Sequence, residues 1–78
     1  MDTKDKNIIK LKFGENLRNI RLAKGFTQEQ LANELGIEIS QISRIERGVI
    51  NTSISTLYCI SLILNVAVSD FFDTGDVS

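Results

Sequence analysis

Residues 27–48, TQEQLANELGIEISQISRIERG, decide the fold of this chain. Two apolar stripes flank Gly36: Leu31, Ala32 and Leu35 before it, and Ile42 and Ile45 after it. Apolar residues at this spacing predict one buried face on each of two short helices. The glycine between them predicts a tight turn, and the whole pattern is typical of a helix-turn-helix.

The polar side chains of the same stretch face away from the two stripes. They are Gln28, Gln30, Glu38, Ser40, Gln41, Ser43, Arg44 and Arg47. Most of these side chains hydrogen-bond well to bases and phosphates, so the pattern indicates DNA binding. The alternative is that they form the ordinary solvated faces of two amphipathic helices.

Local signals predict the neighbouring helices. A periodic apolar face predicts a first helix over about 7–24, which Gly25 ends in a left-handed conformation. Thr27 and Gln30 have the capping-box spacing for a second helix that ends at about Leu35. The third helix is expected to begin at residue 37 or 38 and to end near Arg47.

Two more helices are expected towards the C-terminus. Ser53 predicts the N-cap of a fourth helix over 54–64, and Asn65 can adopt a positive φ after it. Ser69 is the expected cap of a short fifth helix over 70–72. No stretch alternates with a period of two, so the sequence predicts an all-α domain.

The composition is that of one small folded domain. The chain has 78 residues, of which 42% are hydrophobic, and a net charge of −1. We expect an N-terminal arm without order over 1–6, a domain over 7–73 and a flexible tail over 74–78. No apolar run is long enough for a membrane span and no secretory signal opens the chain, which predicts a cytoplasmic protein without a membrane partner.

Charge and chemistry argue against catalysis. Residues 10–48 carry seven basic and five acidic side chains, whereas residues 49–78 carry no basic and three acidic ones. There is no histidine and a single cysteine, Cys59, so triads and zinc sites are not expected. We therefore expect no enzyme activity, no metal, no cofactor and no small-molecule ligand.

Over residues 14–72 the chain resembles the phage-repressor (Xre/Cro-type) helix-turn-helix family. The matching pieces are Arg21, the run 27–32, Gly36-Ile37, the run 42–48, Leu57, the run 64–66 and Phe71-Phe72. The resemblance implies a compact five-helix, lambda-repressor-like domain that binds a palindromic operator as a homodimer and regulates transcription. In length the chain is similar to restriction-modification controller proteins, and it departs from the family at Thr52, where proline is common.

The resemblance also implies roles for individual residues. It places base contacts on Ile39, Ser40, Gln41, Ser43 and Arg44. It places contacts with DNA phosphates on Gln28, Arg47, Asn51 and Thr52. It implies an ion pair between Arg21 and Glu46 that ties the first helix to the end of the third. Ile39 also continues the Ile42–Ile45 stripe, so a place in the core is an equal alternative.

The region after residue 53 holds more apolar side chains than a small domain can bury. We expect a twofold dimer surface formed by Tyr58, Leu62, Val66, Val68, Phe71 and Phe72. The alternative is that Phe71 or Phe72 closes the core instead. The single Cys59 is expected to be a packed small residue.

Two further functions fit the same pattern. In the first, the chain is an antitoxin or an immunity-type repressor whose C-terminal apolar surface binds a partner protein. In the second, it is a protein-interaction module that has lost DNA binding, although Gln28, Arg44 and Arg47 argue against that.

Overall fold

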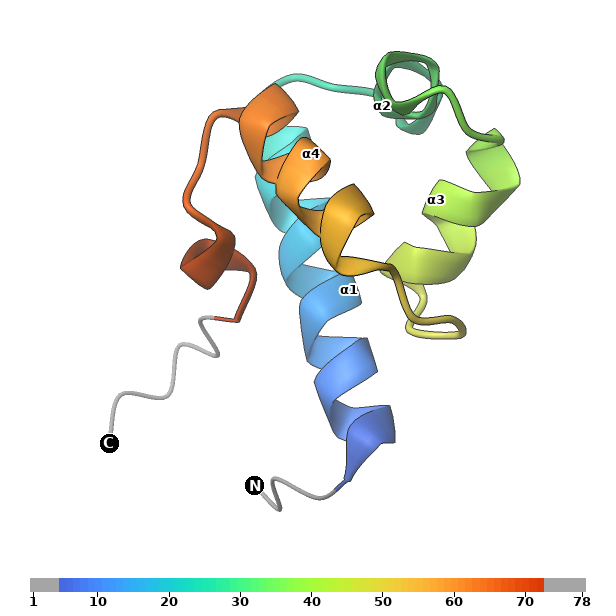
Figure 1. Cartoon of the computed structure of the whole chain (residues 1–78), viewed down its shortest axis with the longest axis vertical. Coiled ribbons are helices and arrows are strands. Elements are labelled where there is room, and N and C mark those ends of the chain that lie inside the picture. Colours follow the sequence, from blue (N-terminus) through green and yellow to red (C-terminus); the bar gives the residue numbers. More distant parts are fainter. Residues whose placement is uncertain (1–4, 73–78) are drawn as a thin grey trace.

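The computed structural model describes residues 5–72, which contain four α-helices and one 3-10 helix but no strand. The elements are α1 (Lys6–Ala23), α2 (Gln28–Leu35), α3 (Ile39–Glu46), α4 (Ile54–Leu64) and η1 (Val68–Phe72). In Figure 1, α2 and α3 lie on one side of the long α1, and η1 lies on the other side. The prediction of an all-α fold is confirmed.

The capping predictions are confirmed around the helix-turn-helix and α4. The backbone N–H of Gln30 donates to Thr27 Oγ1 at 3.0 Å, and the backbone N–H of Thr27 donates to Gln30 Oε1 at 2.9 Å. Gly36 has φ 71° and ends α2, while Asn65 has φ 57° and ends α4. Ser53 caps α4 through a bond from the backbone N–H of Thr56. These caps satisfy backbone groups that a helix end leaves unpaired.

The predicted boundary between the N-terminal arm and the domain is wrong. Asp5 is the N-cap of α1 and Lys6 its first residue, so positions 5 and 6 belong to the folded domain and not to an arm. The carboxylate of Asp5 accepts from the backbone N–H groups of Asn7 and Ile8. The remainder of the predicted arm, over 1–4, and the predicted tail, over 74–78, lie outside the described residues.

The predicted fifth helix is a 3-10 turn that starts earlier than expected. It begins at Val68, so Ser69 lies inside it and is not its cap. The side chain that closes its start is Asp70, whose Oδ2 accepts from the backbone N–H of Ala67 at 3.1 Å. Asn16 of α1 donates from Nδ2 to the backbone oxygen of Phe71 at 2.8 Å. This bond fastens η1 to α1.

One core joins all five elements. Its buried hydrophobic residues are Phe13, Leu17, Leu31, Ala32, Ile42, Ile45, Ile60, Leu64 and Phe71. Helix α1 packs on α3 and η1, and α2 packs on α3 and α4. The two helices of the helix-turn-helix are therefore held from behind by α1 and α4.

Gly14 allows a close approach between the backbones of α1 and α3. A Cβ at this position would lie 2.4 Å from the backbone oxygen of Ile45 and 2.5 Å from that of Glu46. The residue lies inside α1, as the predicted helix over about 7–24 requires. Its role is to let the end of α3 sit directly against the first helix, which fixes the orientation of α3.

Candidate nucleic-acid interface

Helix α3 presents one polar face to solvent because its apolar face is fixed in the core. Ile42 is fully buried and Ile45 nearly so. On the opposite side Ser40, Gln41 and Arg44 are exposed, and Ser43 is half-buried between the two faces. Short polar side chains and an arginine thus project together from one helix.

The first residue of α3 lies outside the core. Ile39 keeps 46% of its surface exposed, although it continues the sequence spacing of Ile42 and Ile45. It is the first residue of α3, whereas the buried residues of this helix are Ile42, Ile45 and Glu46. The structure therefore groups Ile39 with the exposed side chains of the helix.

A buried polar network anchors the other end of α3. Arg21 Nε donates to Glu46 Oε2 at 2.6 Å, and Arg21 Nη2 donates to Glu46 Oε1 at 3.1 Å. The two side chains are 7% and 2% exposed. Arg21 Nη1 also donates to the backbone oxygen of Phe26 at 2.8 Å. A bidentate, desolvated arginine–carboxylate pair holds its partners in one geometry, so α1, the loop before α2 and α3 are locked together.

Gln28 joins this network, which the sequence did not indicate. Its Nε2 donates to Glu46 Oε1 at 3.0 Å, and the side chain is half-buried at the first position of α2. The amide has a second N–H that the bond to Glu46 does not use. Gln28 can therefore brace α3 and still offer a donor at the N-terminus of α2, where the helix dipole favours an anion.

The remaining predicted phosphate contacts lie after α3. Arg47 is exposed, and its Nε donates to the backbone oxygen of Ser43 at 3.3 Å. In the loop that leads to α4, Asn51 is exposed and Thr52 half-buried. These three residues follow α3 in the chain, whereas Gln28 reaches the end of α3 from α2 through its bond to Glu46.

The sequence profile of the helix-turn-helix family matches residues 17–71. The chain belongs to the helix-turn-helix family. Control protein C.BamHI of Bacillus amyloliquefaciens is 43% identical over 68 residues, which cover 86% of this chain and 84% of that protein. Uncharacterised HTH-type transcriptional regulators of Sinorhizobium medicae and Rhizobium meliloti are 41% identical over 70 residues, which cover 90% of this chain. The match covers 50% of each regulator, so this chain spans about half of their length. The resemblance predicted from the sequence is confirmed.

Solved structures agree with this assignment. The crystal structure of the restriction-modification controller protein C.AhdI from Aeromonas hydrophila has a TM-score of 0.82 and 34% identity, and the match covers 87% of this chain and 99% of that one. The biofilm regulator SinR, crystallised in complex with DNA, has a TM-score of 0.72 and 34% identity, and the match covers 78% of this chain and 98% of that one. The helix-turn-helix of this chain thus has the same scaffold as a protein whose structure contains DNA.

On this helix-turn-helix domain, α4 carries a second exposed surface, and it is apolar. Tyr58 and Leu62 are 57% and 62% exposed. Ile54, which is not among the predicted dimer residues, is 84% exposed and lies one turn before Tyr58. Its spacing of four residues from Tyr58 is the signal that could have found it. We name Ile54, Tyr58 and Leu62 the α4 face.

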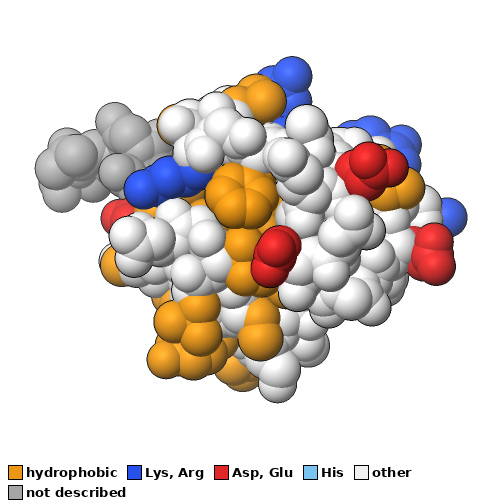
Figure 2. Space-filling view, turned by 90° about the horizontal axis from the view of Figure 1, so that it is seen from above, with side chains coloured by type: hydrophobic (Ala, Val, Ile, Leu, Met, Phe, Trp, Pro, Cys, Tyr) orange, Lys and Arg blue, Asp and Glu red, His pale blue; other side chains and the backbone are white. Residues whose placement is uncertain are grey.

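Figure 2 shows hydrophobic side chains gathered in a band that reaches one edge of the molecule, and no charged side chain lies at that edge. This edge, at the bottom of Figure 2, is the side that faces the viewer in Figure 1, where α4 lies in front of α1. Such patches on a small domain usually mark an interface.

The predicted dimer residues after α4 do not all share this exposure. Phe71 is fully buried and belongs to the core, so its expected place on a dimer surface is wrong. The centroid of its ring lies 5.5 Å from that of Phe13, because η1 packs against α1. Phe72 stays 48% exposed, and Val66 and Val68 are half-buried. Cys59, expected to be packed, is exposed.

No group of three or more His, Cys, Asp or Glu within residues 5–72 is arranged to hold a metal ion. In the same part of the chain, none of the helices has the length and apolar character needed to cross a membrane.

Proposed function

We propose that this chain is a transcriptional regulator that binds a palindromic operator as a homodimer, with α3 in the major groove. The observation that carries the proposal is the division of α3 into a buried apolar face and an exposed polar one at the surface of the domain. A helix in the major groove needs such a face, held rigidly from behind. The likeness to controller proteins supports a regulatory role in a restriction-modification system.

Base reading falls to the exposed face of α3. Arg44 has the geometry for a bidentate bond to the O6 and N7 atoms of guanine. Ser40, Gln41 and Ser43 offer shorter donors and acceptors, and the exposed Ile39 can pack on the methyl group of thymine. Contacts with phosphates would come from Gln28, Arg47, Asn51 and Thr52, and these set the register without reading sequence.

Replacing Arg44 with alanine should weaken binding to the selected operator by about 1–3 kcal/mol and relax the preference at one base position. Because Arg44 is exposed, the variant should melt like the wild type. The measurement is binding to a duplex selected from a random pool, compared with binding to an unselected duplex.

Gln28→Ala is the matched variant for this experiment. It should weaken binding to both duplexes alike, since a phosphate contact carries no sequence information. Its melting must be recorded as well, because the bond from Gln28 to Glu46 is lost. Equal losses for Arg44→Ala on the selected and unselected duplexes would rule out base reading by Arg44.

The α4 face would supply the dimer contact. It is apolar and exposed, and it lies on a different element from the polar face of α3. Two copies joined through it would present two α3 helices to successive major grooves, with half-site centres about 34 Å apart. A short reading face on each protomer makes the second copy necessary for specificity.

Leu62→Glu should convert the dimer into a monomer, because a carboxylate would be buried in the contact without a partner. Sedimentation velocity over a range of protein concentrations measures this change. Leu11→Glu is the control, since Leu11 is similarly exposed, at 54%, but lies on α1. A wild-type chain that aggregates without forming a dimer would instead favour the antitoxin or immunity-type function, in which the α4 face binds a different protein.

A further inference from the structure

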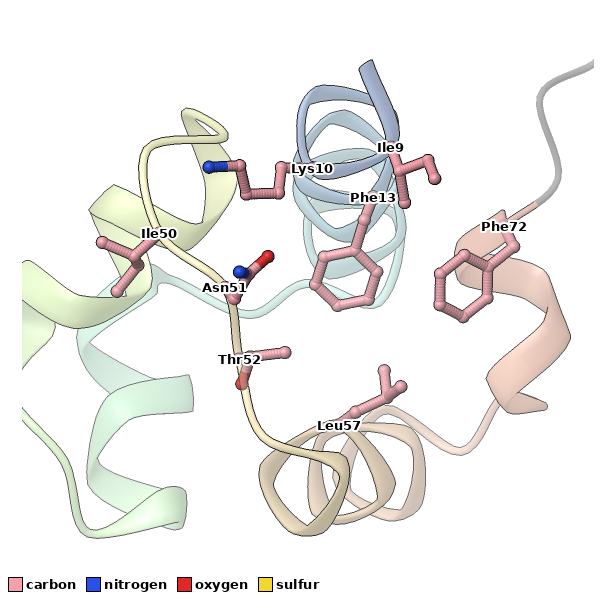
Figure 3. A pocket seen from close by; sticks show the side chains of 8 residues that line it. All are labelled: Ile9, Lys10, Phe13, Ile50, Asn51, Thr52, Leu57 and Phe72. Atoms are coloured by element: carbon pink, nitrogen blue, oxygen red, sulfur yellow. The ribbon is translucent and has the colours of Figure 1, made fainter. Parts of the chain in front are cut away.

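A small pocket lies directly behind the loop that carries Asn51 and Thr52. Its volume is about 120 Å³, and α1, this loop, α4 and η1 all contribute to its lining. Phe13, Leu57 and Phe72 form apolar walls, as Figure 3 shows. The polar residues of the lining are Lys10, Asn51 and Thr52. Lys10 comes from α1, far from the loop in sequence, and Figure 3 shows its ammonium group extending to the side on which the loop runs.

We propose that Lys10 is a further phosphate-contacting residue, which binds the DNA backbone together with Asn51 and Thr52. This inference rests on the proposed function, and it adds a contact from α1 to those made by the helix-turn-helix and the loop. Lysine suits this role because its ammonium group acts as a point charge on phosphate.

The surroundings leave the charge of Lys10 available. Within the part of the chain that the structure describes, no ion pair or hydrogen bond engages its ammonium group, and the pocket contains no acidic residue. Helix α4, which begins just after the loop, has no acidic residue in its first turn, so the positive end of its dipole is unopposed. The local field therefore favours an anion on this side of the domain.

Packing also prepares Lys10 for a contact. The residue is half-buried, and its aliphatic stem shares the pocket with Phe13. A stem that is already ordered loses less conformational entropy when the ammonium group binds phosphate. Lys12 differs, because it lines a separate groove between α1 and the end of α3, which also holds Glu15 and Glu46.

The experiment is the salt dependence of binding to the selected operator. Each phosphate contact contributes about 0.9 to the slope of log affinity against log salt concentration, so Lys10→Ala should lower the slope by about 0.9 for each bound protomer. Between about 50 and 200 mM salt, the affinity of the variant should therefore fall about three- to fourfold less per protomer than that of the wild type. The loss should be the same on selected and unselected duplexes.

Three variants make the test decisive. Lys10→Gln removes the charge but keeps much of the stem, so it separates charge from packing and should match Lys10→Ala. Lys10→Arg should keep the wild-type slope, and Lys12→Ala should leave it unchanged. A wild-type slope in both Lys10→Ala and Lys10→Gln would overturn the role of Lys10 and leave the proposed function intact. A wild-type chain without any salt-dependent binding would overturn the proposed function itself.

Discussion

Replacing Glu46 with alanine is expected to lower the free energy of unfolding by about 3–5 kcal/mol. The variant would leave the Arg21 guanidinium in a site where its side chain is only 7% exposed, without the carboxylate that accepts two of its N–H groups. Gln28 would lose its acceptor at the same time. Small domains are stable by about 5–15 kcal/mol, so this variant should be close to unfolding. Chemical denaturation followed by circular dichroism measures the loss.

Two controls separate the effect of breaking the Arg21–Glu46 ion pair from the effect of removing a glutamate in general. Glu15→Ala removes an exposed acid from α1 and should change stability by no more than about 0.5 kcal/mol. Arg21→Met combined with Glu46→Leu removes both charges, and should be more stable than Glu46→Ala alone because no unpaired charge remains buried. If Glu46→Ala lost less than about 1 kcal/mol, the buried network would not be what holds α3 against α1.

Phe71→Ala should cost about 3–5 kcal/mol of stability, because it empties a fully buried site in the core. The ring packs on Phe13, and the backbone oxygen of Phe71 accepts from Asn16, so η1 should loosen from α1 in this variant. Thermal and chemical unfolding, repeated over a range of protein concentrations, separate this loss from any effect on association.

Phe72→Ala is the matched control for that measurement. The neighbouring ring also contacts Phe13, with centroids 5.6 Å apart, but 48% of Phe72 is exposed. Its loss should therefore cost clearly less than the loss of Phe71. If Phe71→Ala weakened only association and left the stability of the protomer unchanged, Phe71 would belong to the dimer surface and not to the core.

The two phenylalanines show where sequence reasoning stopped. The sequence predicts that both lie on the dimer surface, and it leaves closure of the core by one of them as the alternative, without saying which. The choice depends on the 3-10 geometry of η1, which turns Phe71 inward. That geometry is set by contacts with α1, a long way back in the chain, so no local pattern could indicate it.

In the candidate site, too, local features were predictable from the sequence, whereas contacts between distant segments were not. The amphipathic pattern of α3 is local, so the exposed face was predictable from residues three and four apart. The bond between Gln28 and Glu46, and the approach of Gly14 to the end of α3, join residues on different helices. Their partners become visible only when the helices pack. Lys10 beside the loop at Asn51 is a third case of this kind.

The sequence by itself determined where α2 and α4 begin and end. Thr27 with Gln30, Gly36, Ser53 and Asn65 act on backbone groups within a few residues, so their effects can be read without knowing the fold. Only the tertiary structure decided which of the surplus apolar side chains are covered, leaving Ile54 exposed and Phe71 buried. The physical reason is that burial is a property of packed surfaces, which contacts between distant segments create.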